Sequence, residues 1–466
     1  RVQSVALKLI CEREIEIEKF NIEEYWSISS IFSNLEKKIS SRLIILDNKK
    51  LKKMDIKSKE EAELAIEKIK VPKFKVDKIQ KKRVKRNPSP PFTTSTLQQE
   101  ASNKLGFSAS RTMTIAQKLY EGINIGTETT GLITYMRTDG VQLSSQAIKQ
   151  LRNEILKKHG KKFIPENPRF YKSKAANAQE AHEAIRPTEI SRDPNSLSDF
   201  LDNEQLKLYD LIWKRTISSQ MQSAELDETS IDITSMDRSV MFRANGSQVF
   251  FPGFYIYRDK EDDKILPDLI EEEELKLLSV DSEQHFTQPP PRYTDATLIK
   301  KMEELGIGRP STYASTLRTL NVRNYVLKEK GKHIPEERGR ILTAFLNNFF
   351  GQYIEYDFSA ELEKKLDKIS DGKLSYLNFL DEFWSDFKVH LDKMLRLERT
   401  NINQAIENEL SNLFFPKQET DKNKFSNYKS CPICSDGNLG LEIGKYGAFL
   451  GCSNYPECKY TRQIAN

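Results

Sequence analysis

Apolar residues recur at helical intervals near the start and through the middle of the chain. The segment from Val2 to Phe20 is predicted to be a helix, and helical patterns also run from Thr94 to Glu121. Ser144 is expected to cap a further helix. The apolar face of that helix is made by Ala147, Ile148, Leu151 and Ile155.

Other segments alternate or are rich in β-branched and aromatic residues, which predicts strands. The first is Lys73–Val76, and a short strand is expected over Gly131–Arg137, followed by a turn at Thr138–Gly140. From Ile231 to Tyr257 we expect further strands, with turns at Gly246 and Pro252-Gly253. Strand-rich segments on either side of a helical middle suggest one domain interrupted by another.

Proline clusters at Asn87–Pro91 and Pro289–Pro291 predict boundaries. Beyond the second, helices are expected over Asp295–Leu305 and from Pro310, a helix-turn-helix spacing that most often marks a packing unit. Thr400–Lys424 is polar and is predicted to be a linker.

The chain has 466 residues, 38% hydrophobic and 30% charged, which is enough apolar material for real cores and excludes a disordered chain. No run approaches the roughly 18 uncharged apolar residues of a membrane-spanning helix. The sequence opens with Arg1 and has no signal-peptide pattern, so we expect the native N-terminus to be missing.

Charge is spread unevenly. Lys68–Arg86 holds ten Lys or Arg and one acid, whereas Asp259–Glu274 holds nine acids and two lysines. This asymmetry suggests a polyanion partner, although a solvated basic strand and linker explain the first run equally well.

Four of the five cysteines crowd the C-terminus, as Cys431-x2-Cys434-x17-Cys452-x5-Cys458. Two close thiolate pairs are typical of a tetrahedral structural Zn²⁺ site, although the five residues between Cys452 and Cys458 are more than the usual two to four. Such cysteine usage fits a reducing, cytosolic compartment. A metal-free module of this size would have almost no core. The fifth, Cys11, is expected to be an ordinary buried thiol.

Basic and aromatic residues interleave with these cysteines, a mixture that suits single-stranded nucleic acid. They are Lys429, Lys445, Lys459 and Arg462, with Tyr446, Phe449, Tyr455 and Tyr460.

Three further motifs could carry chemistry, each with a structural alternative. Tyr135 could attack a phosphate with Arg137 supplying charge, although a core tyrosine is the usual case. His182 could act as a general acid or orient a phosphate, although a lone histidine is usually structural. Gly306–Tyr313 could bind a phosphate at the first turn of a helix that starts at Pro310, or be no more than a capped helix.

Together the motifs resemble the signature blocks of type IA DNA topoisomerases, most closely the bacterial type I branch. The matching blocks are Pro90–Leu97, Thr134–Asp139, Ala181–Thr188 and Ile307–Ala314. Their order and spacing agree over nearly the whole chain, and the Cys431–Cys458 module resembles the zinc ribbons of that family.

This resemblance implies a mixed α and β, multidomain fold, a toroidal clamp whose gate opens to pass a second strand. Tyr135 would attack one strand of negatively supercoiled DNA and hold its 5′-phosphate, with Arg137 stabilising the phosphate and His182 binding it or transferring a proton. No ATP would be needed, and we expect a monomer in the bacterial cytoplasm, associated with the nucleoid. The residues implied to contact DNA are Arg1, Gln3, Arg186, Arg309, Ser311, Thr312 and Arg323.

The implied domains divide the chain into seven segments. They are a helical DNA-binding domain in two parts (1–20 and 289–400), a β-rich hinge domain in two parts (21–94 and 222–288), a catalytic tyrosine domain (95–221), a linker (401–424) and a zinc ribbon (425–466).

One departure from the family is large. The family has an N-terminal metal-binding domain with an Asp-x-Asp-x-Glu cluster for Mg²⁺, and this sequence has no such cluster. The chain alone is therefore expected to be inactive, and two functions stay open: a part of a DNA-relaxing enzyme, or a silent single-stranded DNA-binding clamp. A tyrosine recombinase is excluded, because the sequence lacks the several Arg and His residues that are spaced around the tyrosine in that family.

Overall fold

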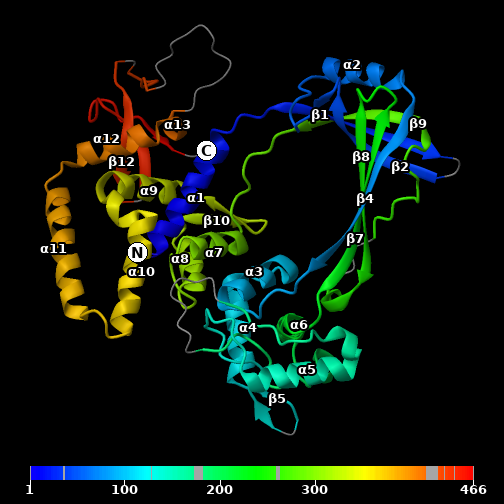
Figure 1. The fold of residues 1–466 in the computed structure, drawn as a ribbon. Coiled ribbons are helices and arrows are strands. Elements are labelled where there is room, and N and C mark those ends of the chain that lie inside the picture. Colours follow the sequence, from blue (N-terminus) through cyan, green and yellow to red (C-terminus); the bar gives the residue numbers. More distant parts are fainter. Residues whose placement is uncertain are drawn as a thin grey trace.

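The computed structural model describes residues 2–34, 37–126, 128–172, 182–258, 263–415, 429–434, 436–445 and 447–464. Its helices and strands form three bodies and a small C-terminal module (Figure 1). None of the helices in these ranges has the length and apolar character to cross a bilayer.

The helical body is built from two distant parts of the chain. Its first helix, α1 (Val2–Glu18), confirms the predicted opening helix, and its apolar face packs against residues from beyond position 290. Those later elements are α7 (Asp295–Glu304), α8 (Tyr313–Val322), the hairpin β10 (Val326–Glu329) and β11 (Lys332–Pro335), α9 (Glu337–Phe350), α10 (Tyr356–Ser370) and α11 (Tyr376–Leu395).

The β body is an antiparallel sheet that closes on itself, because its first strand pairs with both the last strand and the second. In sheet order the strands are β1 (Glu24–Asn34), β9 (Glu274–Phe286), β4 (Phe74–Arg86), β7 (Ala224–Ser235), β8 (Met241–Phe251), β2 (Lys37–Leu46) and β3 (Lys49–Lys50). Helix α2 (Lys59–Lys70) packs on the sheet, and Phe32, Phe74 and Phe242 meet edge to face in the core.

The turn predicted at Gly246 is wrong, because this glycine lies inside β8. An added Cβ would lie 2.6 Å from the Lys264 carbonyl oxygen. Glycine is needed here because another backbone segment crosses the strand closely. The segment Gly253–Tyr257 is also not a strand but a 3₁₀ helix.

The basic run and the acidic run of the sequence meet in this body. Arg83 of β4 donates two hydrogen bonds to Asp227 of β7, at 2.8 and 2.9 Å, and Lys75 pairs with Glu272. These contacts favour the solvated basic strand over a polyanion site for Lys68–Arg86, because acids on neighbouring segments already pair with several of its cations.

The tyrosine body, which contains Tyr135, holds α3 (Thr94–Leu105), α4 (Ala109–Glu121), α5 (Ser145–His159) and α6 (Asn203–Ser219), with the short strands β5 (Ile123–Asn124) and β6 (Thr129–Thr130). Ser144 caps α5 and accepts from the Ala147 N–H, as predicted. The strand predicted over Gly131–Arg137 is wrong: there the backbone makes one isolated bridge, between Ile133 and Pro187.

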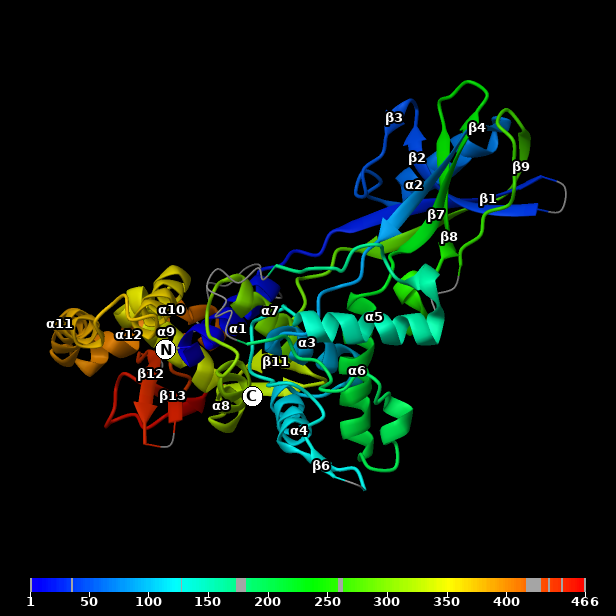
Figure 2. The same ribbon diagram turned by 60° about the horizontal axis from the view of Figure 1, so that its bottom comes forward.

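The three bodies form a ring (Figures 1 and 2). Two chain segments join the β body to the helical body and lie side by side, with the Thr287 N–H donating to the Glu23 carbonyl at 2.9 Å. Two more join it to the tyrosine body, where the Ser223 hydroxyl donates to the Asn87 side chain. The ring closes where α3 packs against α7 and α4 against α8.

The linker predicted over Thr400–Lys424 is wrong in its first half. Residues Arg399–Glu409 form α12 and Ser411–Phe414 form α13, and residues 416–424 lie outside the described residues. Ile402, Ile406, Leu410 and Phe414 recur every four residues and pack against the C-terminal module. That module is a sheet of β12 (Leu439–Gly444), β13 (Gly447–Cys452) and β14 (Thr461–Gln463).

Candidate active site and zinc centre

Hydrogen bonds hold three of the sequence motifs together around Tyr135. The Thr134 N–H donates to the Arg186 carbonyl at 2.9 Å, which joins the tyrosine segment to the His182–Thr188 block. On the other side Thr94, the first residue of α3, donates from its N–H to the Thr138 carbonyl at 2.8 Å. These backbone hydrogen bonds hold the Tyr135 segment as an irregular loop, and not as the strand predicted from the sequence.

Tyr135 is half-buried between two rings. The His182 ring centroid lies 5.3 Å from that of Tyr135, and the Tyr120 ring meets it edge to face at 5.4 Å. Within the described part of the chain, the Tyr135 hydroxyl has no hydrogen-bond partner. The structure thus brings Tyr135 and His182 together, and it leaves Arg137 exposed on the same loop.

Gly140 allows the His182 segment to approach this loop. A Cβ on Gly140 would lie 2.3 Å from the His182 carbonyl oxygen, so any side chain would push that segment away. The spacing between Tyr135 and His182 depends on this close approach.

Arg186, expected to contact DNA, is held by a neighbouring carboxylate. Its Nε and Nη2 donate to the two oxygens of Glu183, both at 2.9 Å, and a Glu183 oxygen also accepts from the Ser144 N–H. Burial alone would raise the pKa of Glu183, but the hydrogen bonds from Arg186 and Ser144 lower it. This pair fixes the turn that carries His182.

Glu183→Gln is expected to loosen that turn by about 0.5–1 kcal/mol, a value discounted for the partial exposure of both side chains. The folded-state pKa of Glu183 lies below its ordinary value of 4.5. The pair therefore contributes fully above that pH, and its contribution is lost as the pH falls through the lowered pKa. Hydrogen exchange of residues 182–188 from pH 7 downward measures this. Glu189→Gln is the control, and equal protection in all three proteins at pH 7 contradicts the prediction.

A cavity of about 340 Å³ lies where the tyrosine loop faces the helical body. Thr138 and Asp139 line it from one side, and Gly308, Arg309 and Tyr313 from the other. The fourth motif therefore shares a cavity with the tyrosine segment, which the sequence could not show.

Arg309 is already paired with acids of α10. Its Nη2 donates to an oxygen of Asp367 at 2.6 Å, and Glu363 lies 3.9 Å from its Nε. DNA bound here must share the guanidinium with these carboxylates or displace it from them, so the role of Arg309 stays a prediction.

The helix predicted to start at Pro310 begins at Tyr313 instead. Ser311 is exposed, and the Thr312 hydroxyl accepts from the Arg309 N–H at 2.8 Å, closing a turn before the helix. Ser311 and Thr312 therefore lie before the helix and not in its first turn, and their contact with a phosphate stays a prediction.

The remaining residues predicted to contact DNA belong to segments distant from Tyr135 in the sequence. Arg323 is exposed at the end of α8, and Gln3 is half-buried on α1. Arg1 lies outside the described residues.

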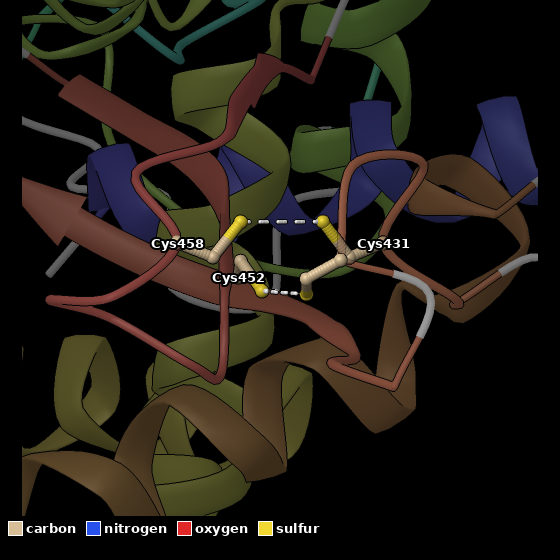
Figure 3. A group of neighbouring side chains, drawn as sticks. Cys431, Cys452 and Cys458 are labelled. Atoms are coloured by element: carbon tan, nitrogen blue, oxygen red, sulfur yellow. Dashed lines mark hydrogen bonds between the residues drawn. The ribbon is translucent and has the colours of Figure 1, made fainter.

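The four C-terminal cysteines form a cluster with the geometry of a metal site (Figure 3). The Sγ atoms of Cys431 and Cys458 are 3.7 Å apart and those of Cys434 and Cys452 are 3.5 Å apart, and all four lie within 4.8 Å of one another. A tetrahedron with Zn–S bonds of 2.3 Å has edges of about 3.8 Å, far longer than a disulfide bond. Four thiols at these distances fit Zn²⁺.

The local backbone helps one thiol to ionise. Burial acts to raise the pKa of Cys431, but backbone N–H groups of Cys434 and Ile433 and the neighbouring thiols lower it to about 7. Gly437 packs so closely that a Cβ there would lie 2.5 Å from the Cys452 sulfur. Burial and the neighbouring thiols raise the pKa of Cys434, so zinc, which binds thiolates, must displace protons from the cluster.

A buried carboxylate of α12 fastens the zinc module to the helices. Glu407, with a side chain only 6% exposed, accepts from Lys429 Nζ at 2.6 Å and from the Leu441 N–H at 2.8 Å. Arg462 donates to the Phe414 carbonyl at 2.8 Å. Lys429 and Arg462, two of the four basic residues that the sequence suggested for binding nucleic acid, therefore contact the helices.

The aromatic residues of the module differ in exposure. Tyr455 is 73% exposed, whereas Phe449 and Tyr460 are partly buried, and Tyr446 lies outside the described residues. Only Tyr455 among the described three presents most of its ring to a base.

Comparisons with known proteins agree with this geometry. Residues 1–381 match a family model described as DNA topoisomerase, and residues 428–466 match one described as topoisomerase DNA binding C4 zinc finger. The full-length topoisomerase I structure of Thermotoga maritima superposes with a TM-score of 0.80 at 33% identity, covering all of this chain and 70% of that one.

Curated relatives carry the same description. The chain is 51% identical to DNA topoisomerase 1 of Rickettsia bellii over its whole length, and 46% identical to that of Zymomonas mobilis over 99% of its length. It spans 58% of the first protein and 38% of the second, so it covers only part of each.

Proposed function

Since this chain belongs to the type IA family of DNA topoisomerases, we propose that it serves to relax negatively supercoiled DNA without ATP. The observation that carries the proposal is the convergence of three motifs on Tyr135, with the His182 ring 5.3 Å away. A fourth motif faces the same loop across the cavity.

In the proposed reaction the Tyr135 hydroxyl oxygen attacks a backbone phosphorus of one strand. The phosphorus–O3′ bond breaks, the upstream fragment leaves as a free 3′-hydroxyl, and the downstream 5′-phosphate stays on the tyrosine. The phenol proton goes to a base or solvent, and the leaving oxygen gains a proton. Religation reverses these steps, so the phosphotyrosine conserves the bond energy and supercoiling drives the change.

Arg137 and His182 are proposed to assist this step. The exposed Arg137 guanidinium can donate two hydrogen bonds to the phosphate, whose negative charge grows in the transition state. His182, beside the phenol, can bind the phosphate or hand a proton to the leaving O3′ atom.

The family resemblance also implies a magnesium ion, which prefers oxygen ligands. In the part of the chain that the structure describes, one group of three or more metal-binding side chains lies close enough to share an ion, namely the four cysteines. These four thiols suit zinc and do not fit magnesium.

Plasmid relaxation tests the proposal. Negatively supercoiled plasmid is treated without ATP, using the chain alone and the chain joined to the segments of its relatives that it does not match. Stepwise relaxation by the joined protein supports the proposal. Binding of the plasmid with no change in linking number would instead favour a silent DNA-binding clamp.

Single-stranded DNA is expected to bind more tightly than duplex, with an affinity that falls steeply as salt rises, because phosphate contacts release counterions. Tyr455→Leu should weaken single-strand binding by about 1–3 kcal/mol, since leucine has no π-face for a base. Fluorescence anisotropy with labelled oligonucleotides measures both effects.

The control for that variant is Ile433→Ala, an equally exposed apolar residue of the same module. Equal affinity for the two DNA forms, or equal losses in Tyr455→Leu and Ile433→Ala, contradicts the prediction.

A further inference from the structure

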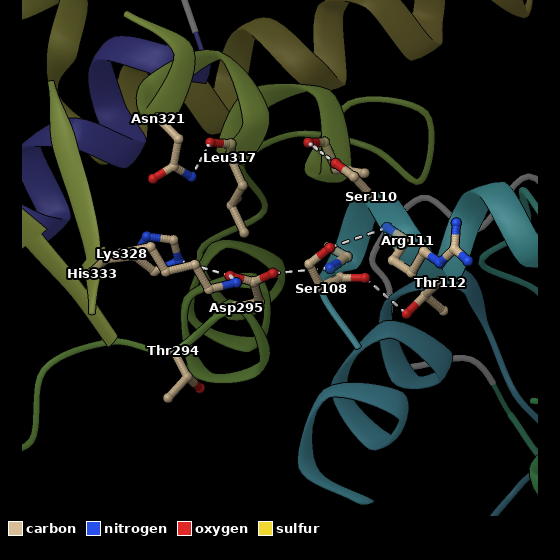
Figure 4. A network of polar contacts seen from close by, with 12 residues as sticks. Ser108, Ser110, Arg111, Thr112, Thr294, Asp295, Leu317, Asn321, Lys328 and His333 are labelled. Carbon is tan, nitrogen blue, oxygen red and sulfur yellow. Dashed lines mark hydrogen bonds and ion pairs between the residues drawn. The ribbon is translucent and has the colours of Figure 1, made fainter. Parts of the chain in front are cut away.

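Asp295 lies buried where the tyrosine body meets the helical body (Figure 4). It is the first residue of α7, and its side chain is 4% exposed. One carboxylate oxygen accepts from the Ala109 N–H at 2.9 Å. The other accepts from Lys328 Nζ at 2.7 Å and from His333 Nε2 at 2.9 Å.

The two groups on the second oxygen belong to the helical body and are fixed there. Lys328 and His333 lie on the β10–β11 hairpin, and the His333 N–H donates to the Tyr293 carbonyl at 2.8 Å, just before Asp295. Burial would raise the pKa of Asp295, but hydrogen bonds from His333, Lys328 and Ala109 hold it at about 2. The carboxylate is therefore charged at any physiological pH.

The group on the first oxygen comes from the other body. Ala109 is the first residue of α4, so its N–H has no acceptor within that helix. Its side chain is 1% exposed and packs in the core of the helical body, with Tyr313 and Leu317. Next to it, Ser110 donates to the Ala314 carbonyl at 3.3 Å.

We propose that Asp295 is the latch of the DNA gate, a carboxylate of the helical body that holds the start of α4 and is released when the bodies separate. This inference rests on the proposed function, which requires a gate between the tyrosine and the helical body.

The partners of Asp295 make the latch reversible. When α4 leaves, the carboxylate keeps Lys328 and His333, so no unpaired buried charge remains. The freed Ala109 amide is a helix-terminal donor that water can satisfy. Closing restores a charge-assisted hydrogen bond in a dry interface, which is stronger than a neutral one.

Thiol reactivity measures opening without DNA or catalysis. In an Ala109→Cys background the introduced thiol is buried only while the interface is closed. Its rate of alkylation by excess iodoacetamide, followed by peptide mass spectrometry, reports how often the bodies separate. Asp295→Ala is expected to raise this rate about tenfold or more, the factor that loss of one such hydrogen bond gives.

The natural Cys11 provides an internal control. It is 3% exposed in the core of the helical body, so its alkylation reports unfolding of that body. Asp295→Asn keeps the shape with a neutral acceptor and should give an intermediate rate. Lys328→Met leaves the contact to Ala109 and should not raise the rate.

The proposal is overturned if alkylation at position 109 is unchanged in Asp295→Ala, or if it rises only in step with Cys11. Faster alkylation at position 109 in Asp295→Ala, together with failed plasmid relaxation, would overturn the proposed function alone. The alkylation rate does not depend on DNA relaxation.

Discussion

Tyr135→Phe is expected to reduce plasmid relaxation by at least about a thousandfold in any preparation that relaxes DNA, because the phenol oxygen is the proposed nucleophile. The ring keeps its contacts with His182 and Tyr120, so the fold and DNA binding should not change. The measurement is the rate of relaxation by gel electrophoresis, with DNA affinity measured on the same samples.

Tyr120→Phe is the matched control, because it removes one hydroxyl from the ring that packs against Tyr135. It should keep most of the activity. A Tyr135→Phe protein that still relaxes plasmid at a normal rate would remove Tyr135 from the mechanism.

Zinc removal is expected to unfold residues 429–464. The module has few apolar residues of its own, and structural zinc contributes on the order of 10 kcal/mol to folding such domains. Because Ile406 and Phe414 share its core, α12 and α13 should also lose protection. Hydrogen exchange with and without a chelator measures this, with zinc content determined by elemental analysis.

Cys434→Ser should reproduce the effect of the chelator, whereas Cys11→Ser should not, because Cys11 packs in the core of the helical body and is not one of the ligands. Zinc-free protein with an ordered module would contradict the prediction. So would loss of protection that spreads through α3–α6.

Local chemistry made several elements predictable. The helical spacing of Val2–Ile10 and the Ser144 cap each depend on residues near in sequence, and both elements are where the sequence placed them. The cysteine spacing likewise predicted a cluster whose sulfur distances fit zinc.

The failed predictions involve contacts with distant residues. The Tyr135 segment reads as a strand, but its partners are Thr94 and Arg186, which hold it as an irregular loop. Polar Arg399–Glu409 reads as a linker, yet a stripe of isoleucines and the buried Glu407 bind it to a module some thirty residues later. Composition cannot show such pairings.

The same limit applies to the contacts between the bodies. The motifs around Tyr135 and His182 were found from sequence, but the contacts of Asp295 and Glu303 across the interface were not. Their partners lie on α4 and α3: the Ala109 N–H donates to Asp295, and the Ser95 hydroxyl donates to Glu303 at 2.7 Å. A Thr-Asp pair at a helix start gives no signal beyond ordinary capping.

The central claim is that Tyr135 becomes linked to a DNA 5′-phosphate. The most direct measurement uses a single-stranded oligonucleotide labelled at its 3′ end and the chain joined to the remaining segments of its relatives. After denaturation and digestion, mass spectrometry identifies the peptide that carries DNA. The account predicts that the label stays on protein and that the modified residue is Tyr135. A DNA adduct on any other residue, or loss of the 3′ label from the protein, would contradict it.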